Sequence, residues 1–215
     1  MLIAKASGLI SIPDDLAAVA AAPLLCAGLT TFSALRNSTA RPPDLVAVLG
    51  IGGLGHLAVQ YARHMGFEVA AIGRGDDKTG LAKKLGAHHY IDSLTADVAK
   101  ELQALGGAAL VLATASGGSA LAQTVKGLRP RGHLITLGVT SEPLGVSPTD
   151  LIFSSRSVDG ALTGDPKTGE RALKFSSLNG VAALIETMPL ARAPEAYARM
   201  MSGQAHFRMV LTMND

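Results

Sequence analysis

Hydrophobic positions along the chain alternate between short continuous apolar runs and longer amphipathic stretches. The runs at 45–49, 67–72 and 108–113 are apolar at nearly every position, which is typical of strands buried on both faces of a parallel sheet. The stretch 54–65 repeats apolar residues every three or four positions, the period of one helical face. The pattern therefore predicts strands that alternate with helices.

The whole pattern predicts six strands joined mostly by helices. The strands are expected at 45–49, 67–72, 89–91, 108–113, 133–139 and 157–162, and the helices at 54–65, 77–85, 95–105 and 119–128. A turn containing Pro130 is expected at 129–132. This order indicates an α/β fold with a doubly wound (Rossmann) parallel six-stranded sheet.

Both ends of the chain fall outside that strand count. The segment 2–35 is expected to form two short helices, split at Pro23 because proline interrupts a helix. Further helices are expected at 168–177 and 193–202, and an apolar strand at 208–213.

The apolar stretch 16–35 is uncharged and about long enough to cross a membrane. It is rich in Ala and Thr, contains Pro23 and follows two aspartates, so a buried helix pair is the better interpretation. We expect neither a membrane partner nor a secretory leader.

Composition narrows the class of protein further. Hydrophobic residues make up 48% and charged residues 17% of the chain, the balance of a globular protein. The net charge is +2, with scattered Lys and Arg and no Trp, which argues against a nucleic-acid partner. The single cysteine, Cys26, excludes an internal disulfide and favours a reducing compartment, so we expect a cytoplasmic protein.

A full G-x-G-x-x-G motif occupies 50–55, directly after a predicted buried strand and at the start of a predicted helix. In that context Gly50 permits a tight turn, Gly52 lets a pyrophosphate approach the backbone, and Gly55 lets the helix pack closely on the strand. Gly53 and Leu54 complete the loop whose N–H groups face the anion. A glycine-rich turn without a ligand is the alternative; a Walker loop is excluded because no Lys-Ser or Lys-Thr follows.

The end of the second strand indicates which dinucleotide binds. A carboxylate there would hold the ribose 2′-hydroxyl of NAD, but this chain has Gly73 followed by Arg74. Arg74 can bind a 2′-phosphate through its planar guanidinium, and Lys78 offers a second cation. Asp76 and Asp77 are interpreted as helix-capping residues, and a solvated surface cation is the alternative for Arg74. We therefore expect NADP in preference to NAD.

Several segments together resemble the zinc-dependent alcohol dehydrogenases of the medium-chain dehydrogenase/reductase superfamily. They are 21–30, which contains Cys26, the glycine segment 50–56, and the shorter pieces 83–87, 128–132 and 207–211. The resemblance covers essentially the whole chain.

The resemblance implies roles for residues that the pattern alone leaves unassigned. It implies that Cys26 is a catalytic zinc ligand and that Thr30 lies beside the nicotinamide, which makes both catalytic candidates. It implies cofactor contacts at four further positions: Thr114, Gly138, Val139 and Arg208. Without the resemblance, Cys26 would be interpreted as a small buried apolar residue, and a single thiolate does not make a catalytic zinc site.

Members of that family carry a further N-terminal portion that supplies the other zinc ligands and most of the catalytic domain. The resemblance therefore implies three regions. Residues 1–27 are expected to be a remnant of the catalytic domain with a linking helix, 28–163 the NAD(P)-binding domain, and 164–215 a segment that packs on the catalytic domain.

The function this implies is the cofactor-binding portion of an NADP-preferring alcohol dehydrogenase, which transfers hydride between the nicotinamide and an alcohol or aldehyde. We expect it to be inactive alone, to meet its substrate only with a complete catalytic domain, and to form a homo-oligomer. Zinc is expected in the intact family enzyme. Two alternatives stay open: a non-catalytic NADP-binding or interaction module, and a zinc-free quinone-reductase-like member.

Overall fold

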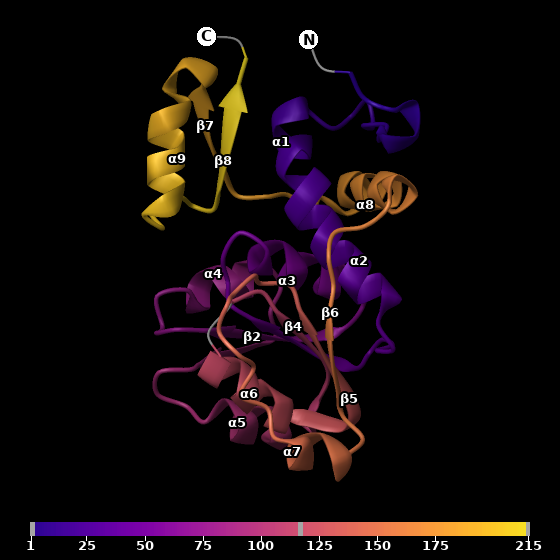
Figure 1. Ribbon diagram of the computed structural model, residues 1–215, viewed down its shortest axis with the longest axis vertical. Coiled ribbons are helices and arrows are strands. Elements are labelled where there is room, and N and C mark those ends of the chain that lie inside the picture. Colours follow the sequence, from indigo (N-terminus) through magenta and orange to yellow (C-terminus); the bar gives the residue numbers. More distant parts are fainter. Residues whose placement is uncertain (1–2, 116–117, 214–215) are drawn as a thin grey trace.

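A six-stranded, entirely parallel sheet forms the centre of the computed structural model, which describes residues 3–115 and 118–213 (Figure 1). Its strands are β1 (Leu45–Leu49), β2 (Glu68–Gly73), β3 (His89–Asp92), β4 (Ala108–Ala113), β5 (Leu128–Thr136) and β6 (Ser157–Gly160). Their order, β3-β2-β1-β4-β5-β6, is that of the doubly wound fold, which confirms the predicted fold class. The order reverses between β1 and β4, so the carboxyl ends of these strands flank the crevice where such folds bind ligands.

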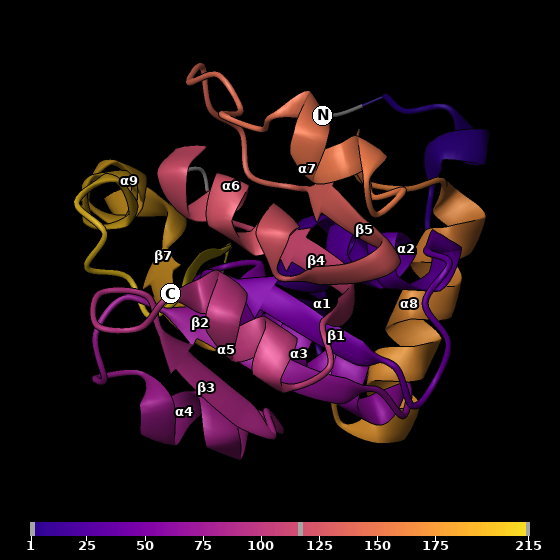
Figure 2. The ribbon, with the colours of Figure 1, turned by 90° about the horizontal axis from the view of Figure 1, so that it is seen from below.

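Two apolar cores cover the two faces of the sheet, because successive residues of a strand point to opposite faces. Val46 and Val48 of β1 belong to one core with α3 (Gly55–His64) and α4 (Thr79–Lys84). Ala47 and the other alternate residues belong to a second core with α5 (Val98–Ala104) and α6 (Gly118–Lys126). In Figure 2 the molecule is seen from the side of α5 and α6.

The N-terminal helical run differs from its prediction. It continues from α1 (Ala18–Pro23) through a π-helical segment, Leu24–Gly28, into α2 (Leu29–Asn37), so the predicted split at Pro23 is wrong. Pro23 has no N–H to donate. The helix does not end there but changes directly after it into the wider π-helical turn. Within the described residues, this is the one helical run long and apolar enough to cross a membrane. It packs against α3 and α8 and is largely buried, as core helices are.

The prediction also placed the start of β5 wrongly. The predicted turn at 129–132 is part of the strand, which begins at Leu128 and changes register against β4 between Ala108 and Leu110. Arg131 takes a positive φ of 59° within this irregularity. Bulges of this kind bend a strand without ending it. A proline such as Pro130 can stand in a strand at a bulge.

The chain then crosses to a separate region above the sheet. After α7 (Pro148–Ile152), α8 (Pro166–Asn179) begins with Asp165 accepting from the Thr168 N–H and ends at Gly180, whose φ is +66°. Residues 180–213, the C-terminal unit, contain β7 (Ile185–Pro189), α9 (Ala193–Met201) and β8 (Arg208–Thr212). The sequence did not predict α7 or β7; β7 pairs with β8 in a two-stranded parallel sheet.

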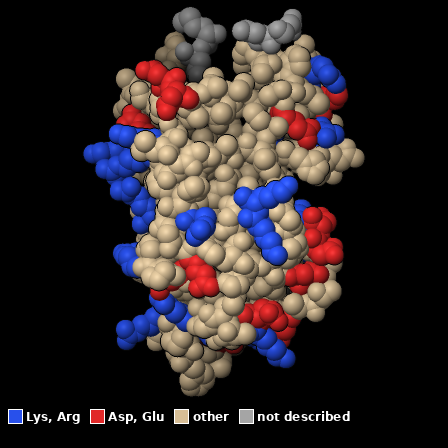
Figure 3. Space-filling model, turned by 180° about the vertical axis from the view of Figure 1, so that it is seen from behind, with Lys and Arg blue, Asp and Glu red and all other residues tan. Residues whose placement is uncertain are grey.

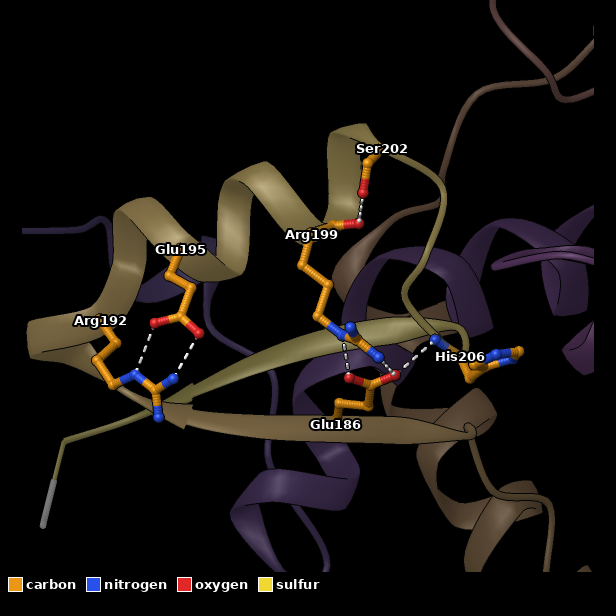
Figure 4. Close-up of polar contacts among 6 residues, drawn as sticks. All are labelled: Glu186, Arg192, Glu195, Arg199, Ser202 and His206. Carbon is orange, nitrogen blue, oxygen red and sulfur yellow. Dashed lines mark hydrogen bonds and ion pairs between the residues drawn. The ribbon is translucent and has the colours of Figure 1, made fainter.

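Charged side chains hold the C-terminal unit together (Figure 4). On β7, Glu186 accepts from Arg199 Nε of α9 at 2.5 Å and from the His206 backbone N–H at 2.9 Å. Arg192 pairs with Glu195 at the start of the same helix. The two contacts of Glu186 fix α9 and the loop before β8 onto β7.

Candidate functional site

A groove of about 770 Å³ lies at the carboxyl ends of β1, β2 and β4. Its lining brings together eight of the predicted cofactor-binding residues. These are Gly50, Gly52, Gly53, Leu54, Gly73, Arg74, Lys78 and Thr114; Gly55 is the next residue of the same loop. The groove also contains Ser93, Leu94 and Gln123, which sequence reasoning missed. Ser93 directly follows β3 and could have been found by its place at a strand end; Gln123 lies within α6 and gave no signal.

The glycine loop has the shape that its motif predicted. Gly50 has φ +90°, and a Cβ there would come within 2.7 Å of the Ala115 Cβ. A Cβ on Gly55 would lie 1.7 Å from the Gly50 carbonyl oxygen, so α3 can pack against the end of β1 only at a glycine. Around Gly52, by contrast, there is open space, which is where a pyrophosphate needs close access to the backbone. The loop therefore fits a dinucleotide.

Two side chains hold the carbonyl groups of Gly52 and Gly53 in this loop. His56, which is fully buried, lies with Nδ1 2.8 Å from the Gly52 oxygen. Arg208 donates from Nε to the Gly53 oxygen at 3.1 Å, and a Cβ on Gly53 would come within 2.8 Å of that nitrogen. Burial lowers the pKa of Arg208, an effect that the nearby Cys26 opposes. Arg208 thus reaches the predicted pyrophosphate loop from the C-terminal unit.

Three residues around β3 fix the backbone on either side of Arg74. Tyr90 donates to the Gly75 oxygen at 2.6 Å, and Ser93 donates to the Gly73 oxygen at 2.7 Å. Asp92 accepts from the Gly75 N–H at 2.7 Å. Hydrogen bonds, first from the Leu94 N–H and then from its other neighbours, hold the pKa of Asp92 below its usual value, so its carboxylate is already engaged.

The side chain of Arg74 is exposed at the groove. Lys78, also in the groove lining, lies 5.7 Å from the centre of the Phe207 ring, a cation–π distance. Lys78 is the N-cap of α4, so the interpretation of Asp76 and Asp77 as the helix cap is wrong. A dianionic phosphate at this end of the groove would meet two cations.

The strand-end residues divide into two groups. Thr114 donates to the carbonyl oxygens of Leu49 and Gly50 at 2.9 and 2.8 Å, so its hydroxyl anchors the start of the glycine loop. A Cβ on Gly138 would lie 2.9 Å from the Thr114 oxygen, which keeps the two chains in close contact. Val139 is 96% exposed. Neither Gly138 nor Val139 is among the residues that line the groove.

Cys26 and Thr30 do not line the groove either. Thr30 is buried in α2, whereas Cys26 is exposed on the π-helical segment. The interpretation of Cys26 as a buried apolar residue is therefore wrong. The described part of the chain contains no group of three or more His, Cys, Asp or Glu residues that could hold a metal. Since a catalytic zinc takes three protein ligands, these residues do not make a zinc site by themselves.

Charge is mixed on one face of the molecule. On the face in Figure 3, Lys and Arg side chains are interspersed with Asp and Glu side chains and with large uncharged areas.

Comparisons with known proteins agree with this geometry. Residues 53–177 match a protein-family model described as zinc-binding dehydrogenase. The chain is 44% identical over 210 residues, 98% of its length, to alcohol dehydrogenase notN of Aspergillus sp. strain MF297-2. It is 37% identical over 213 residues to an alcohol dehydrogenase of Geobacillus stearothermophilus. The chain spans 62% and 63% of these two relatives.

Two solved structures with bound dinucleotides are similar as well. Acetophenone reductase from Geotrichum candidum NBRC 4597, in complex with NAD, gives a TM-score of 0.87 at 28% identity, over 97% of this chain and 60% of that one. CAD from Helicobacter pylori, complexed with NADP(H), gives a TM-score of 0.79 at 31% identity, over 95% of this chain and 58% of that one.

Proposed function

The chain belongs to the zinc-binding dehydrogenase family, and we propose that it is the dinucleotide-binding part of an NADP-preferring alcohol dehydrogenase. The reaction of the whole enzyme is hydride transfer between the nicotinamide and an alcohol or aldehyde. Under this proposal 28–163 form the NAD(P)-binding domain, while 1–27 and 164–215 belong with the catalytic domain. The homo-oligomer expected from the resemblance remains part of the proposal.

One observation carries the proposal: the glycine loop opens α3 at the floor of a groove large enough for a nucleotide. The first N–H groups of a helix have no acceptor within the helix, and the helix dipole favours an anion there. The space around Gly52 lets a pyrophosphate approach those groups. The relatives named above include structures in complex with NAD and with NADP(H), which supports the same ligand class.

The roles of the residues follow from their places in the groove. When bound, the dinucleotide supplies the hydride donor or acceptor. The glycine loop would bind the pyrophosphate, with Thr114 and Arg208 holding its backbone in place. Thr30 would contact the nicotinamide, as the family resemblance implies. The described residues do not form a zinc site by themselves. Cys26 would contribute one thiolate ligand to a zinc site whose other ligands lie outside these residues.

Preference for NADP is proposed from the end of β2. Gly73 offers no carboxylate for the ribose hydroxyl, and its Cβ position is occupied by Tyr90, whose Oη lies 2.2 Å away. Arg74 and Lys78 line the adjacent wall. A guanidinium binds a phosphate through charge-assisted, bidentate hydrogen bonds, so a 2′-phosphate would gain affinity at this position.

The test is to titrate NADPH and NADH separately into the wild-type protein and into Arg74→Ala. Binding is monitored by nicotinamide fluorescence. We expect the wild type to bind NADPH more tightly than NADH. Arg74→Ala should weaken the affinity for NADPH by about 10- to 100-fold, as expected for the loss of a charged hydrogen bond. NADH affinity should hardly change. Arg36→Ala removes an exposed arginine of α2 and serves as the matched control. Binding of neither dinucleotide by the folded protein would contradict the proposal.

Catalytic activity of this chain alone is a separate question. We propose that it does not oxidise alcohols by itself, because its described residues offer one thiolate where three ligands are needed. Measurable, zinc-dependent alcohol oxidation by the purified chain would refute this. Zinc-independent reduction of a quinone would instead favour the zinc-free alternative, against which Cys26 argues because it lies in the segment that resembles the zinc-dependent family. If the chain binds a dinucleotide but shows no activity even when a catalytic domain is supplied, a non-catalytic binding module would be favoured.

A further inference from the structure

A fully buried histidine stands directly behind the glycine loop, outside the groove lining. His56 is the second residue of α3, and both of its ring nitrogens are engaged. Nδ1 lies 2.8 Å from the Gly52 carbonyl oxygen, and Nε2 lies 3.1 Å from the backbone nitrogen of Leu184 in the C-terminal unit. Because neither nitrogen is free, the ring cannot bind a metal or touch the dinucleotide.

The two contacts define one protonation state. The Leu184 N–H must donate, so Nε2 carries a lone pair. The Gly52 carbonyl can only accept, so Nδ1 carries the proton. The ring is therefore the neutral, Nδ1-protonated tautomer. Burial, with a smaller effect from the Arg208 charge, lowers the pKa of His56 to about 4, which keeps the ring neutral under ordinary conditions.

From these contacts we infer that His56 is a positioning residue: it aims the glycine-loop N–H groups into the groove and couples the loop to the C-terminal unit. In a trans peptide the C=O and the following N–H point in opposite directions. The Gly52 oxygen accepts from Nδ1 at 2.8 Å and from the His56 backbone N–H at 3.1 Å, so the ring adds a second hydrogen bond that holds this carbonyl toward His56 and turns the Gly53 N–H the opposite way. Arg208 does the same for the next peptide by holding the Gly53 oxygen. The inference rests on the dinucleotide-binding function proposed above.

The neighbouring turn of α3 offers an internal comparison. Gln60 donates from Nε2 to the His56 oxygen at 2.9 Å and to the Ala182 oxygen at 3.0 Å, while its Oε1 accepts from the Ala182 N–H. An amide in this helix can therefore bridge the carbonyl four residues back and the C-terminal unit, as His56 does. Gln60 differs in one respect: these hydrogen bonds join it to His56 and Ala182 and not to the glycine loop. It ties down the same segment without positioning the loop.

Three variants separate positioning from a merely structural role. His56→Phe keeps a ring against Phe207, whose centre lies 5.2 Å from that of His56, but removes both hydrogen bonds. His56→Gln restores a donor and an acceptor in the manner of Gln60. Gln60→Leu removes the second tie and is the matched control. The readouts are the dissociation constant of NADP⁺ by calorimetry and the amide hydrogen exchange of Gly53 and Leu54.

We expect His56→Phe to raise the dissociation constant about tenfold, the effect of one misdirected hydrogen bond, and to speed exchange at both loop amides. His56→Gln should stay within about threefold of wild type, and Gln60→Leu within about twofold. Wild-type affinity in His56→Phe, equal weakening in Gln60→Leu, or failure of His56→Gln to restore binding would each overturn the inference.

Two provisions keep the outcomes distinct. If His56→Phe does not fold, nitrogen NMR of the wild-type ring decides: a neutral Nδ1–H tautomer at neutral pH supports the inference, whereas an Nε2–H or charged ring overturns it. If the wild-type protein binds no dinucleotide, the proposed function fails. The loop amides of the His56 variants and of Gln60→Leu would then still show whether His56 positions the loop.

Discussion

Acidification should destabilise this protein through one buried side chain, His56. Burial lowers its pKa from 6.5 to about 4 in the folded state, while the unfolded chain keeps the ordinary value. Between these two values the unfolded state binds a proton that the folded state excludes, so acid favours unfolding. The stabilisation by neutral His56 is complete above 6.5 and is lost as the pH falls toward 4; below 4 both states are protonated and the loss stops.

The size of this effect follows from the pKa difference. One pKa unit corresponds to about 1.4 kcal/mol, so a fall from 6.5 to about 4 corresponds to about 3 kcal/mol of unfolding free energy. A loss of this size is a large fraction of the stability of an ordinary domain.

The assay is urea denaturation of wild type and His56→Gln at several values between about pH 7 and about pH 4.5. Carboxylates titrate in both proteins and cancel when the two free energies are subtracted. Because the interval stops above the folded-state pKa of about 4, the wild type should lose about 2 kcal/mol more than His56→Gln over it. Parallel curves for the two proteins would refute the reasoning, because they would mean that His56 titrates normally or is not buried in the folded state.

Three further substitutions test packing and polar contacts, each by denaturation. Gly73→Ala should cost about 1–3 kcal/mol through the clash of its Cβ with Tyr90, and adding Tyr90→Phe should recover part of that loss; no recovery would contradict the contact. Arg129→Ala should cost about 1–2 kcal/mol by removing a bidentate partner of Asp44. Burial raises the pKa of Asp44, but hydrogen bonding and the charge of Arg129 outweigh it and hold this pKa below 3.8. The cost of Arg129→Ala should therefore fade as the pH falls below 3.8 and Asp44 becomes protonated. Tyr61→Phe should cost about 1 kcal/mol by deleting a buried hydrogen bond to α8; an unchanged midpoint would contradict it.

The sheet could be predicted because its signals are local. Residues 45–49 and 108–113 are continuous apolar runs, and their predicted bounds match β1 and β4. The glycine motif likewise carries its meaning in adjacent residues, and the structure places it at the predicted strand–helix junction. Where propensity, periodicity and turn residues all indicate the same element, that element can be predicted without knowing its tertiary contacts.

The errors fall where distant contacts decide the structure. Residues 129–132 look like a turn, yet Arg129 is held in β5 by its ion pair with Asp44, 85 positions earlier. The strand β7 has no strong alternation, and it exists because β8 pairs with it and Arg199 of α9 binds Glu186. Neither partner can be identified from the segment itself, since the pairing is between residues far apart in the chain.

The candidate site divides in the same way. Backbone requirements of the loop were visible as glycines, but the residues that orient the loop were not. His56 gives no sequence signal for its role, because its second partner, Leu184, lies 128 positions later. Arg208 was assigned to the pyrophosphate region only through the family resemblance, and its contact with Gly53 spans 155 positions.

Tyr90 adds a structural reason for the residue type at the end of β2. Its phenol donates to the Gly75 oxygen and occupies the space that any side chain at Gly73 would need. A carboxylate therefore cannot be introduced at Gly73 without displacing Tyr90 and releasing the loop that carries Arg74. The bond that fixes this loop thus also excludes the NAD-type carboxylate from that position. Glycine at 73 and arginine at 74 are for this reason better understood as one arrangement than as two independent residues.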